Sequence, residues 1–323
     1  MAAPSLPRLS LGGVPFGREI DEAASRDLLD YALERGLNLI DTAEAYGGGN
    51  SRLARRNAYQ IDDAREVSDE MHSSEKIIGR WLDARGCRDR MKICTKFNSG
   101  GSRAQVKAAL AGSLERLKTD YVDVYMLHCA YPNVPIRETL EALTEEVQAG
   151  RIRAIGCSNF TLAQLTEAQE TAIAHGLQRM GATQPSFSLA EASIRQDFLP
   201  YCIAHDIATM TYSPLAAGFL TGKYSPQGEI PKGTRFDISP AHTKVFFSER
   251  NFRILENLKA LSEETGESMA RLAMAWVLRQ PGVTSIIVGA RTRAHINNAL
   301  DALERPVDPA LLDRMTGWLE AKA

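Results

Sequence analysis

Four ionisable side chains follow short apolar segments: Asp41 and Tyr46 in NLIDTAEAYG, Lys96 in ICTKF, and His128 in VYMLH. A tyrosine can protonate a nascent alkoxide near neutral pH if its pKa is drawn toward that range, and a nearby lysine cation does this by favouring phenolate. Lys96 would be that cation, and Asp41 would hold it charged and aimed. His128 would hydrogen-bond the substrate oxygen. These residue types predict acid–base chemistry on a carbonyl or alcohol oxygen.

The segments that carry these residues belong to a regular alternation of strands and helices. The apolar runs are typical of buried parallel strands, at residues 8–14, 36–43, 91–97, 122–128, 152–158, 181–187, 207–213 and 285–290. Helical periodicity lies between and after them, at residues 22–35, 73–84, 103–117, 136–149, 161–174, 198–205, 251–280 with a break near Gly266, and 292–303.

Eight such units in one chain favour a (β/α)8 TIM barrel, because right-handed crossovers let the eighth strand close on the first. We expect a single domain over residues 1–323. Catalytic residues of this fold lie at the carboxyl ends of the strands. The four ionisable side chains are therefore expected to converge at one mouth.

Charge and composition narrow the class of partner. The formal net charge is -2 and acids and bases are interspersed, so no field favours nucleic acid or a membrane surface. The five cysteines lack CxxC spacing, which suits reduced thiols better than disulfides or a metal site. No export segment or membrane-spanning run is visible. We expect a soluble, cytoplasmic protein that acts on a small molecule, with its oligomeric state open.

The sequence resembles the aldo-keto reductase superfamily over nearly its whole length. Asp41 and Tyr46 match the D-x4-Y spacing of that family, Lys96 and His128 match its lysine and histidine, and GCSNF is family-like. YSPLAAGFLTGKY resembles the bacterial branch that includes the voltage-gated potassium channel β subunits. The resemblance implies reversible, NADPH-dependent reduction of an aldehyde or ketone to an alcohol, with Tyr46 as general acid and base.

The resemblance also implies a cofactor site, although the chain has no GxGxxG after a strand. The nicotinamide amide would be bound by Ser158, Asn159 and Gln184, and Tyr212 would stack on the ring. The diphosphate would be wrapped by Ser213, Leu215, Gly218 and Lys223, and Arg235 would reach the phosphate or adenine end.

The segment IIVGARTRAHINNAL, with Gly289, Arg291 and His295, resembles the adenosine-phosphate segment of the family. The family usually has Gln at the position of His295 and Asn at that of Ala299. Arg291 and Arg293 would lie near a 2′-phosphate, which favours NADPH, with NADH possible. The alternative is that these arginines lie on a solvated helix N-terminus.

Other readings stay open at this stage. A charged insertion at about residues 48–72 would be a lid, a subunit contact or a solvated loop without a role. A cofactor-binding regulatory subunit with little turnover is an alternative to the enzyme. A third hypothesis makes Lys96 a Schiff-base nucleophile. The substrate itself is not readable from the sequence.

Overall fold

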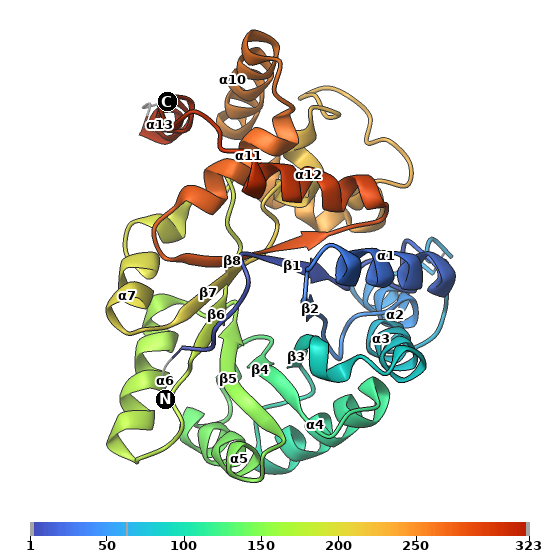
Figure 1. The fold of residues 1–323 in the computed structure, drawn as a ribbon, viewed down its shortest axis with the longest axis vertical. Coiled ribbons are helices and arrows are strands. Elements are labelled where there is room, and N and C mark those ends of the chain that lie inside the picture. Colours follow the sequence, from blue (N-terminus) through green and yellow to red (C-terminus); the bar gives the residue numbers. More distant parts are fainter. Residues whose placement is uncertain (1–2, 63, 321–323) are drawn as a thin grey trace.

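The computed structural model describes residues 3–62 and 64–320, and its centre is a closed parallel barrel (Figure 1). The strands are β1 Leu9–Gly12, β2 Leu39–Asp41, β3 Lys92–Phe97, β4 Val122–Leu127, β5 Ile152–Ser158, β6 Ala182–Gln184, β7 Ala208–Thr211 and β8 Val283–Gly289. They pair in sequence order, and β8 pairs with β1 from Leu9 opposite Ile286 to Gly12 opposite Gly289. The expected TIM barrel is confirmed.

Helices surround this ring and follow the predicted ranges closely. They are α1 Glu22–Glu34, α3 Ser73–Arg85, α4 Arg103–Leu117, α5 Ile136–Gln148, α6 Leu162–Ala174, α7 Phe198–Ala204, α11 Met269–Arg279 and α12 Arg293–Glu304. The predicted break near Gly266 separates α10 Glu249–Thr265 from α11, and Gly266 ends α10 with a φ of 70°. Capping boxes at Ser102 and Thr161 fix where α4 and α6 begin.

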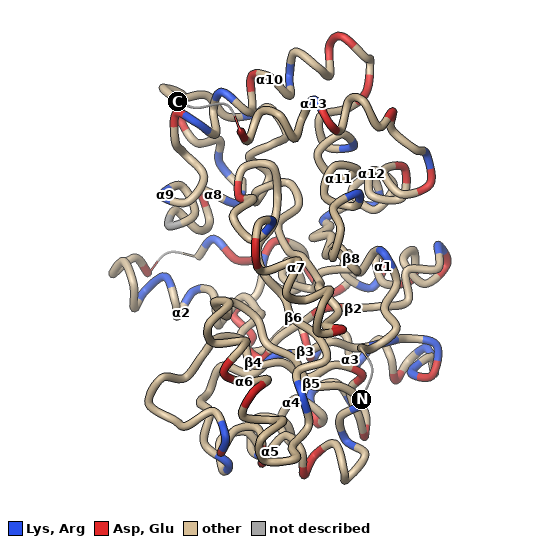
Figure 2. Tube along the Cα trace, turned by 90° about the vertical axis from the view of Figure 1, so that its left-hand side faces the viewer, with Lys and Arg blue, Asp and Glu red and all other residues tan. Residues whose placement is uncertain are grey.

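Several further elements lie outside the predicted ranges. These helices are α2 Gly48–Tyr59, α8 Arg235–Ile238, α9 Thr243–Phe246 and α13 Pro309–Glu320, with 3-10 turns η1 Arg88–Arg90, η2 Ser193–Arg195, η3 Ala216–Thr221 and η4 Pro240–His242. The insertion therefore begins with a helix. Figure 2 shows α2, α8 and α9 on one side of the molecule. A hydrogen bond from Arg65 Nη1 to the carbonyl oxygen of Asp237, 2.5 Å long, joins the insertion to α8.

The hydrophobic core has two layers that meet at the strands. In β4, Val124 and Met126 belong to a small cluster inside the barrel, whereas Tyr125 and Leu127 belong to the larger cluster beneath the helices. Because both faces of each strand are covered, the strands read as continuous apolar runs. The barrel interior is thus packed with side chains, and polar groups collect at its end.

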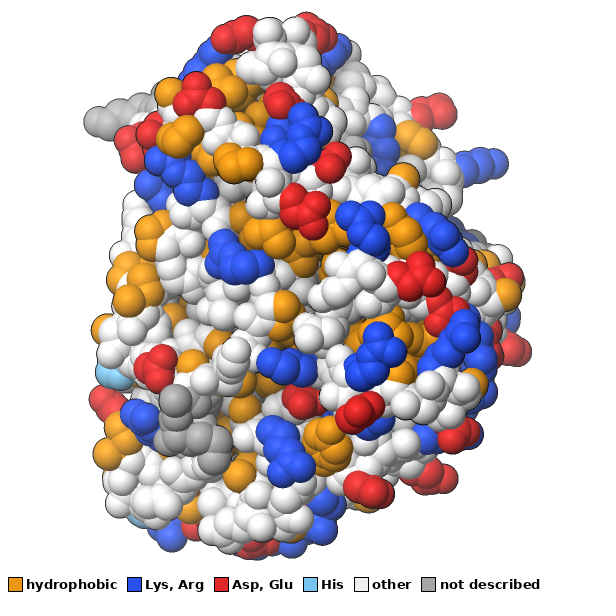
Figure 3. Space-filling model, viewed as in Figure 1, with side chains coloured by type: hydrophobic (Ala, Val, Ile, Leu, Met, Phe, Trp, Pro, Cys, Tyr) orange, Lys and Arg blue, Asp and Glu red, His pale blue; other side chains and the backbone are white. Residues whose placement is uncertain are grey.

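The outer surface carries charges of both signs, and the cysteines are not paired in disulfides. Acidic and basic side chains are interspersed on the face seen in Figure 3. All five cysteines are free, four of them buried and Cys129 exposed. Within residues 3–62 and 64–320, no helix combines the length and apolar character that crossing a membrane requires.

Candidate active site

Lys96 lies at the centre of the polar groups at the barrel mouth. It is completely buried, and its Nζ donates to both carboxylate oxygens of Asp41 at 2.9 Å and to the carbonyl oxygen of Thr42 at 2.7 Å. Burial is the largest single influence and lowers the pKa of Lys96, but the charge and hydrogen bond of Asp41, together with the neighbouring Tyr46 and Cys94, raise the pKa above its ordinary 10.5. The ammonium is therefore fixed in its charged form.

Tyr46 lies against this cation, after β2. The phenol Oη is 3.5 Å from Lys96 Nζ, which is also 4.8 Å from the centroid of the tyrosine ring. Burial raises the pKa of Tyr46 above its ordinary 10.0, and the Lys96 charge lowers it by a smaller amount. Lys96 thus acts in the expected direction, but the net shift of the Tyr46 pKa is upward because burial of the phenol has the larger effect. The sequence alone did not show that burial.

His128 completes the group, immediately after β4. Its ring packs edge-on against Tyr46 with centroids 5.6 Å apart. Burial, and next the charge of Lys96, lower the pKa of His128 from 6.5 to about 3, so the imidazole is neutral. Its Nδ1 is buried and has no hydrogen-bond partner among the residues that the structure describes. Such a ring can hydrogen-bond a substrate oxygen without carrying a charge.

A layer of amides and hydroxyls links the ends of β5, β6 and β7. Gln184 Nε2 donates to Asp41 Oδ1 at 2.7 Å, and Ser158 Oγ donates to the carbonyl oxygen of Gln184 at 2.8 Å. Asn159 Nδ2 donates to the carbonyl oxygen of His128 at 2.9 Å, and Asn159 Oδ1 accepts from Tyr212 Oη at 2.8 Å. The side chains expected at the nicotinamide therefore lie together beside Asp41 and His128.

The loop after β7 has an unusual backbone. Ser213, Ala216, Ala217 and Gly218 have positive φ angles of 57°, 49°, 56° and 88°, and Leu215 lies between them. The change from negative φ at Leu215 to positive φ at Ala216 turns successive backbone N–H groups toward a common point, which is a known arrangement for binding anions. Strained backbone of this kind clusters at functional sites. The segment suits the diphosphate role expected for it.

A basic group lies next to that loop. A Cβ added at Gly218 would be 3.3 Å from Lys223 Nζ, and Arg291 Nη1 donates to the carbonyl oxygen of Gly233 at 3.1 Å. The pKa values of Lys223 and His295 are lowered first by burial and then by the Arg291 charge. Three basic side chains from the loops after β7 and β8 therefore share one region, and Gly289 leaves open space beside the last strand.

Two arginines expected at the phosphate end have acidic partners in the structure. Arg293 forms an ion pair with Asp27 of α1, and its guanidinium lies 4.9 Å from the Tyr31 ring centroid. This exposed pair joins the start of α12 to α1, and a role of Arg293 at a 2′-phosphate stays a prediction. Arg235 Nη1 lies 3.6 Å from Glu19 Oε1, in a cluster that also contains Arg18.

Arg18 and Glu19 were missed by sequence reasoning. They follow β1 in the turn GVPFGREI, and their position after a strand end is the signal in the sequence that could have identified them.

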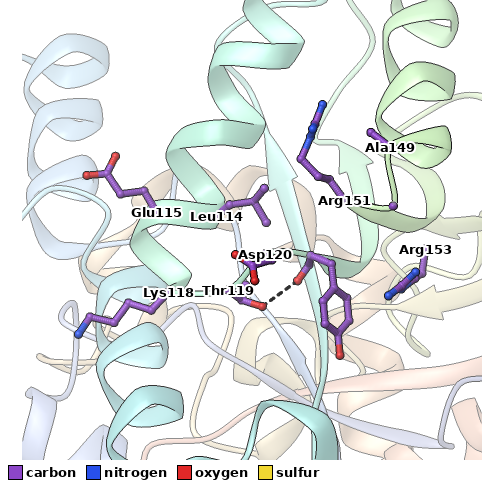
Figure 4. A pocket seen from close by; sticks show the side chains of 10 residues that line it. Leu114, Glu115, Lys118, Thr119, Asp120, Ala149, Arg151 and Arg153 are labelled. Carbon is purple, nitrogen blue, oxygen red and sulfur yellow. Dashed lines mark hydrogen bonds between the residues drawn. The ribbon is translucent and has the colours of Figure 1, made fainter.

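One surface pocket lies apart from this site. It has a volume of about 680 Å³ and lies between the segments that precede β4 and β5 (Figure 4). There Thr119 Oγ1 donates to the carbonyl oxygen of Tyr121 at 3.1 Å. These are the amino ends of the strands, whereas chemistry in barrels of this type occurs at the carboxyl ends. The mouth around Lys96 is the candidate active site.

Comparison with known proteins agrees with this geometry. A family model described as the aldo/keto reductase family matches residues 8–320. The chain belongs to the aldo/keto reductase family.

Relatives of this aldo/keto reductase match it over nearly its full length. Aldo-keto reductase YhdN of Bacillus subtilis is 31% identical over 96% of this chain and 83% of its own. A probable voltage-gated potassium channel subunit beta of Oryza sativa is 32% identical over 97% of this chain and 92% of its own. The structure of the glycerol dehydrogenase AKR11B4 from Gluconobacter oxydans has a TM-score of 0.76 at 25% identity, covering 98% and 94% of the two chains. The protein is an oxidoreductase of this family.

Within this aldo/keto reductase, the state of Lys96 argues against the Schiff-base hypothesis. A lysine nucleophile needs a lowered pKa so that its amine is free, whereas Lys96 is held as a cation by Asp41. No cluster of three or more His, Cys, Asp or Glu side chains suited to a metal occurs among the described residues.

Proposed function

We propose that this aldo/keto reductase uses NADPH to reduce an aldehyde or ketone to an alcohol, reversibly, with Tyr46 as general acid. One observation carries the proposal: the Lys96 ammonium lies between the Asp41 carboxylate and the Tyr46 phenol, with the neutral His128 ring beside them. The bound nicotinamide would supply the hydride, or accept it in the reverse direction.

The protein's own groups account for the proton. The neutral His128 imidazole donates a hydrogen bond to the carbonyl oxygen and orients it toward Tyr46. As negative charge grows on that oxygen, the Tyr46 phenol transfers its proton to it. The phenolate that is left is stabilised by the Lys96 cation, whose charge is maintained by Asp41. In alcohol oxidation the same phenolate removes the proton.

The residues at the mouth fit the dinucleotide on two observations. Tyr212 Oη bonds to Asn159, which lies beside Ser158 and Gln184. An aromatic ring therefore lies next to amide groups. The loop of Ser213, Leu215 and Gly218, which contains four residues with positive φ, leads to the basic group of Lys223, Arg291 and His295, beside Gly289.

We propose that the first group of residues holds the nicotinamide and that the second holds the phosphates. Arg291 and Lys223 favour NADPH over NADH, because cations suit the additional 2′-phosphate. The free, mostly buried thiols support a cytoplasmic location.

The decisive variant is Tyr46→Phe. It removes one hydroxyl and is expected to lower kcat by about 10²- to 10⁴-fold, the usual contribution of a general acid, while the Kd for NADPH changes little. Turnover is measured as NADPH oxidation with a panel of aldehydes and ketones. Tyr125→Phe is the matched control, because Tyr125 is buried beneath the helices and should keep wild-type turnover. Retained activity in Tyr46→Phe would refute the assignment.

A second candidate function is a cofactor-binding regulatory subunit with little turnover. It is favoured by the channel-subunit names of relatives at 30% and 32% identity. The same panel distinguishes the two: NADPH binding without oxidation of any substrate would favour the regulatory function. The intact arrangement of Asp41, Tyr46, Lys96 and His128 favours the enzyme.

A further inference from the structure

The tyrosine loop, residues 42–46, is held on one side by the end of strand β3. Glu44 N–H donates to the carbonyl oxygen of Lys96 at 2.8 Å, and Glu44 Oε2 accepts from Asn98 N–H at 3.0 Å. The first of these bonds continues the parallel pairing of β2 with β3 beyond the end of β2. The tyrosine loop is therefore aligned with the strand that carries Lys96.

The other side of the tyrosine loop is held by the residues at the start of α3. His72 Nδ1 lies 2.5 Å from the carbonyl oxygen of Glu44, and Ser74 N–H donates to the carbonyl oxygen of Tyr46 at 3.4 Å. Ser74 Oγ also lies 2.8 Å from Thr42 Oγ1. Because a carbonyl oxygen can only accept, Nδ1 of His72 carries the proton and donates. The loop is thus held between β3 and the start of α3.

The insertion fixes the position of His72. The backbone of His72 is left-handed, with a φ of 57°, a conformation that residues other than glycine rarely adopt. Its N–H donates to Asn50 Oδ1 of α2 at 2.6 Å. His72 is the residue before α3, but its side chain does not cap that helix and bonds to Glu44 instead. Strained backbone and a missing cap both reduce stability, and here both accompany a ring that contacts the tyrosine loop.

Glycines after Tyr46 let the tyrosine loop and the insertion approach closely. A Cβ added at Gly47 would lie 2.6 Å from the backbone nitrogen of Ser73, and one added at Gly48 would lie 1.8 Å from the carbonyl oxygen of Ser68. The chain that follows the phenol is therefore in direct backbone contact with the returning part of the insertion. A displacement of that part would be transmitted to Tyr46.

The contact between the phenol and the cation leaves little tolerance for such a displacement. Tyr46 Oη is 3.5 Å from Lys96 Nζ, at the outer limit of a hydrogen bond. Lys96 is fixed by Asp41 and by the carbonyl oxygen of Thr42, so it cannot follow a tyrosine that moves away. Misplacement of a catalytic group by about 1 Å can lower the rate about 10²-fold.

We propose that His72 is a positioning residue, which holds the tyrosine loop through the carbonyl oxygen of Glu44. In this position the Tyr46 phenol meets the Lys96 cation. Because His72 ends the insertion, the insertion influences catalysis through the tyrosine loop. The effect on turnover rests on the proposed function, whereas the bond from Nδ1 is a property of the fold.

Two substitutions separate the hydrogen bond of His72 from its backbone conformation. His72→Asn keeps an N–H near the position of Nδ1, and asparagine tolerates left-handed backbone. His72→Gly tolerates the same backbone but has no side-chain donor. We expect His72→Gly to lower kcat about 10- to 100-fold, with KM and the Kd for NADPH within about twofold of wild type, and His72→Asn to recover most of kcat. Turnover is measured as NADPH oxidation with the best aldehyde or ketone of the panel.

Gln60→Gly is the matched control. Gln60 also has left-handed backbone in the insertion, with a φ of 58°, and its exposed side chain bonds to Asn57 of the same helix. This variant should keep wild-type kinetics, and melting temperature verifies that each variant is folded. Equal losses of kcat in Gln60→Gly and His72→Gly, or a loss that His72→Asn does not recover, would overturn the proposal. A rise in KM alone would also overturn it and assign His72 to substrate binding.

Nitrogen NMR tests the hydrogen bond without turnover. Which ring nitrogen of a neutral histidine carries the proton is set by the bond that the ring makes. The wild-type His72 ring should be protonated at Nδ1, as identified by the signals that disappear in His72→Asn. A neutral ring protonated at Nε2 would overturn the proposal even in an active reductase. Protonation at Nδ1 in a wild type that reduces no carbonyl would instead refute the proposed function, and with it the effect of His72 on catalysis.

Discussion

At the scale of single residues, the site combines one fixed charge with one neutral ring. Lys96 keeps its proton because Asp41 lies 2.9 Å away in a place from which water is excluded. His128 lies in the same desolvated region but has no carboxylate partner, so burial removes its charge. Burial lowers the pKa of both groups, and their net shifts are opposite because only Lys96 has a counter-ion.

The state of His128 predicts the pH dependence of the reaction. Since burial lowers its pKa to about 3, the imidazole stays neutral from pH 5 to 8. Profiles of kcat/KM for carbonyl reduction should show no ionisation near 6.5 on the acidic side. His128→Gln should lower kcat/KM without changing the shape of the profile. An acidic limb near pH 6.5 that disappears in His128→Gln would contradict this assignment.

The same shift has a consequence for folding. The unfolded chain binds a proton at His128 near pH 6.5, whereas the folded chain does so only near pH 3. The stability contributed by the neutral ring is therefore complete above pH 6.5 and is lost as the pH falls toward 3. Between these two pH values, the free energy of unfolding should fall by about 1.4 kcal/mol per pH unit because of this one group. Urea unfolding of wild type and His128→Gln at pH 7 and pH 5 measures the difference.

At the scale of elements, the insertion is a folded unit joined to the mouth. Arg55 of α2 pairs with Glu66, and both side chains are at most 4% exposed. Gly49 N–H donates to the carbonyl oxygen of Glu70 at 3.2 Å, which joins α2 to the returning segment. These contacts belong to a folded element and not to a freely solvated loop.

The buried pair predicts how this element can be opened. Glu66→Gln removes the carboxylate that accepts from Arg55, and breaking a buried pair costs about 3–5 kcal/mol. Limited proteolysis within residues 60–72 should therefore become at least tenfold faster. Asp62→Asn is the matched control, since Asp62 pairs with Arg52 in an exposed position and should have little effect. Equal cleavage rates in the two variants would contradict the bracing role.

At the scale of the whole molecule, the proposed cofactor site joins loops from distant parts of the sequence. Lys223 follows β7 and Arg291 follows β8, whereas Tyr212 is tied to Asn159 at the end of β5. Closure of the barrel places all of them around one mouth. A dinucleotide bound there would add contacts between segments that are far apart in the sequence.

This arrangement predicts selective stabilisation by the cofactor. A ligand at 100 times its Kd stabilises the folded state by about 2.7 kcal/mol. At equal concentrations, NADPH should raise the Tm more than NADH does, and Arg291→Ala should narrow that difference. Arg314→Ala is the control, because Arg314 pairs with Glu264 on the outer helices. Equal Tm shifts from the two cofactors in the wild type would contradict the preference for NADPH.

The amino-acid sequence by itself determined the barrel and the group of residues around Lys96. Each strand is buried on both faces, so it can be recognised from the apolar run in its own residues. Parallel strands in a barrel also bring their carboxyl ends together. Asp41, Lys96 and His128 lie at or directly after strand ends, so their meeting followed from strand order.

Only the tertiary structure decided the rest. Arg235 lies beside Glu19, and Arg293 pairs with Asp27, because long side chains on loops and helix ends bind whichever charged group packing brings within reach. The net pKa of Tyr46 depends on how completely neighbouring segments exclude water from it. Local periodicity specifies neither the partners of these arginines nor the pKa of Tyr46, since both depend on contacts between residues far apart in the chain.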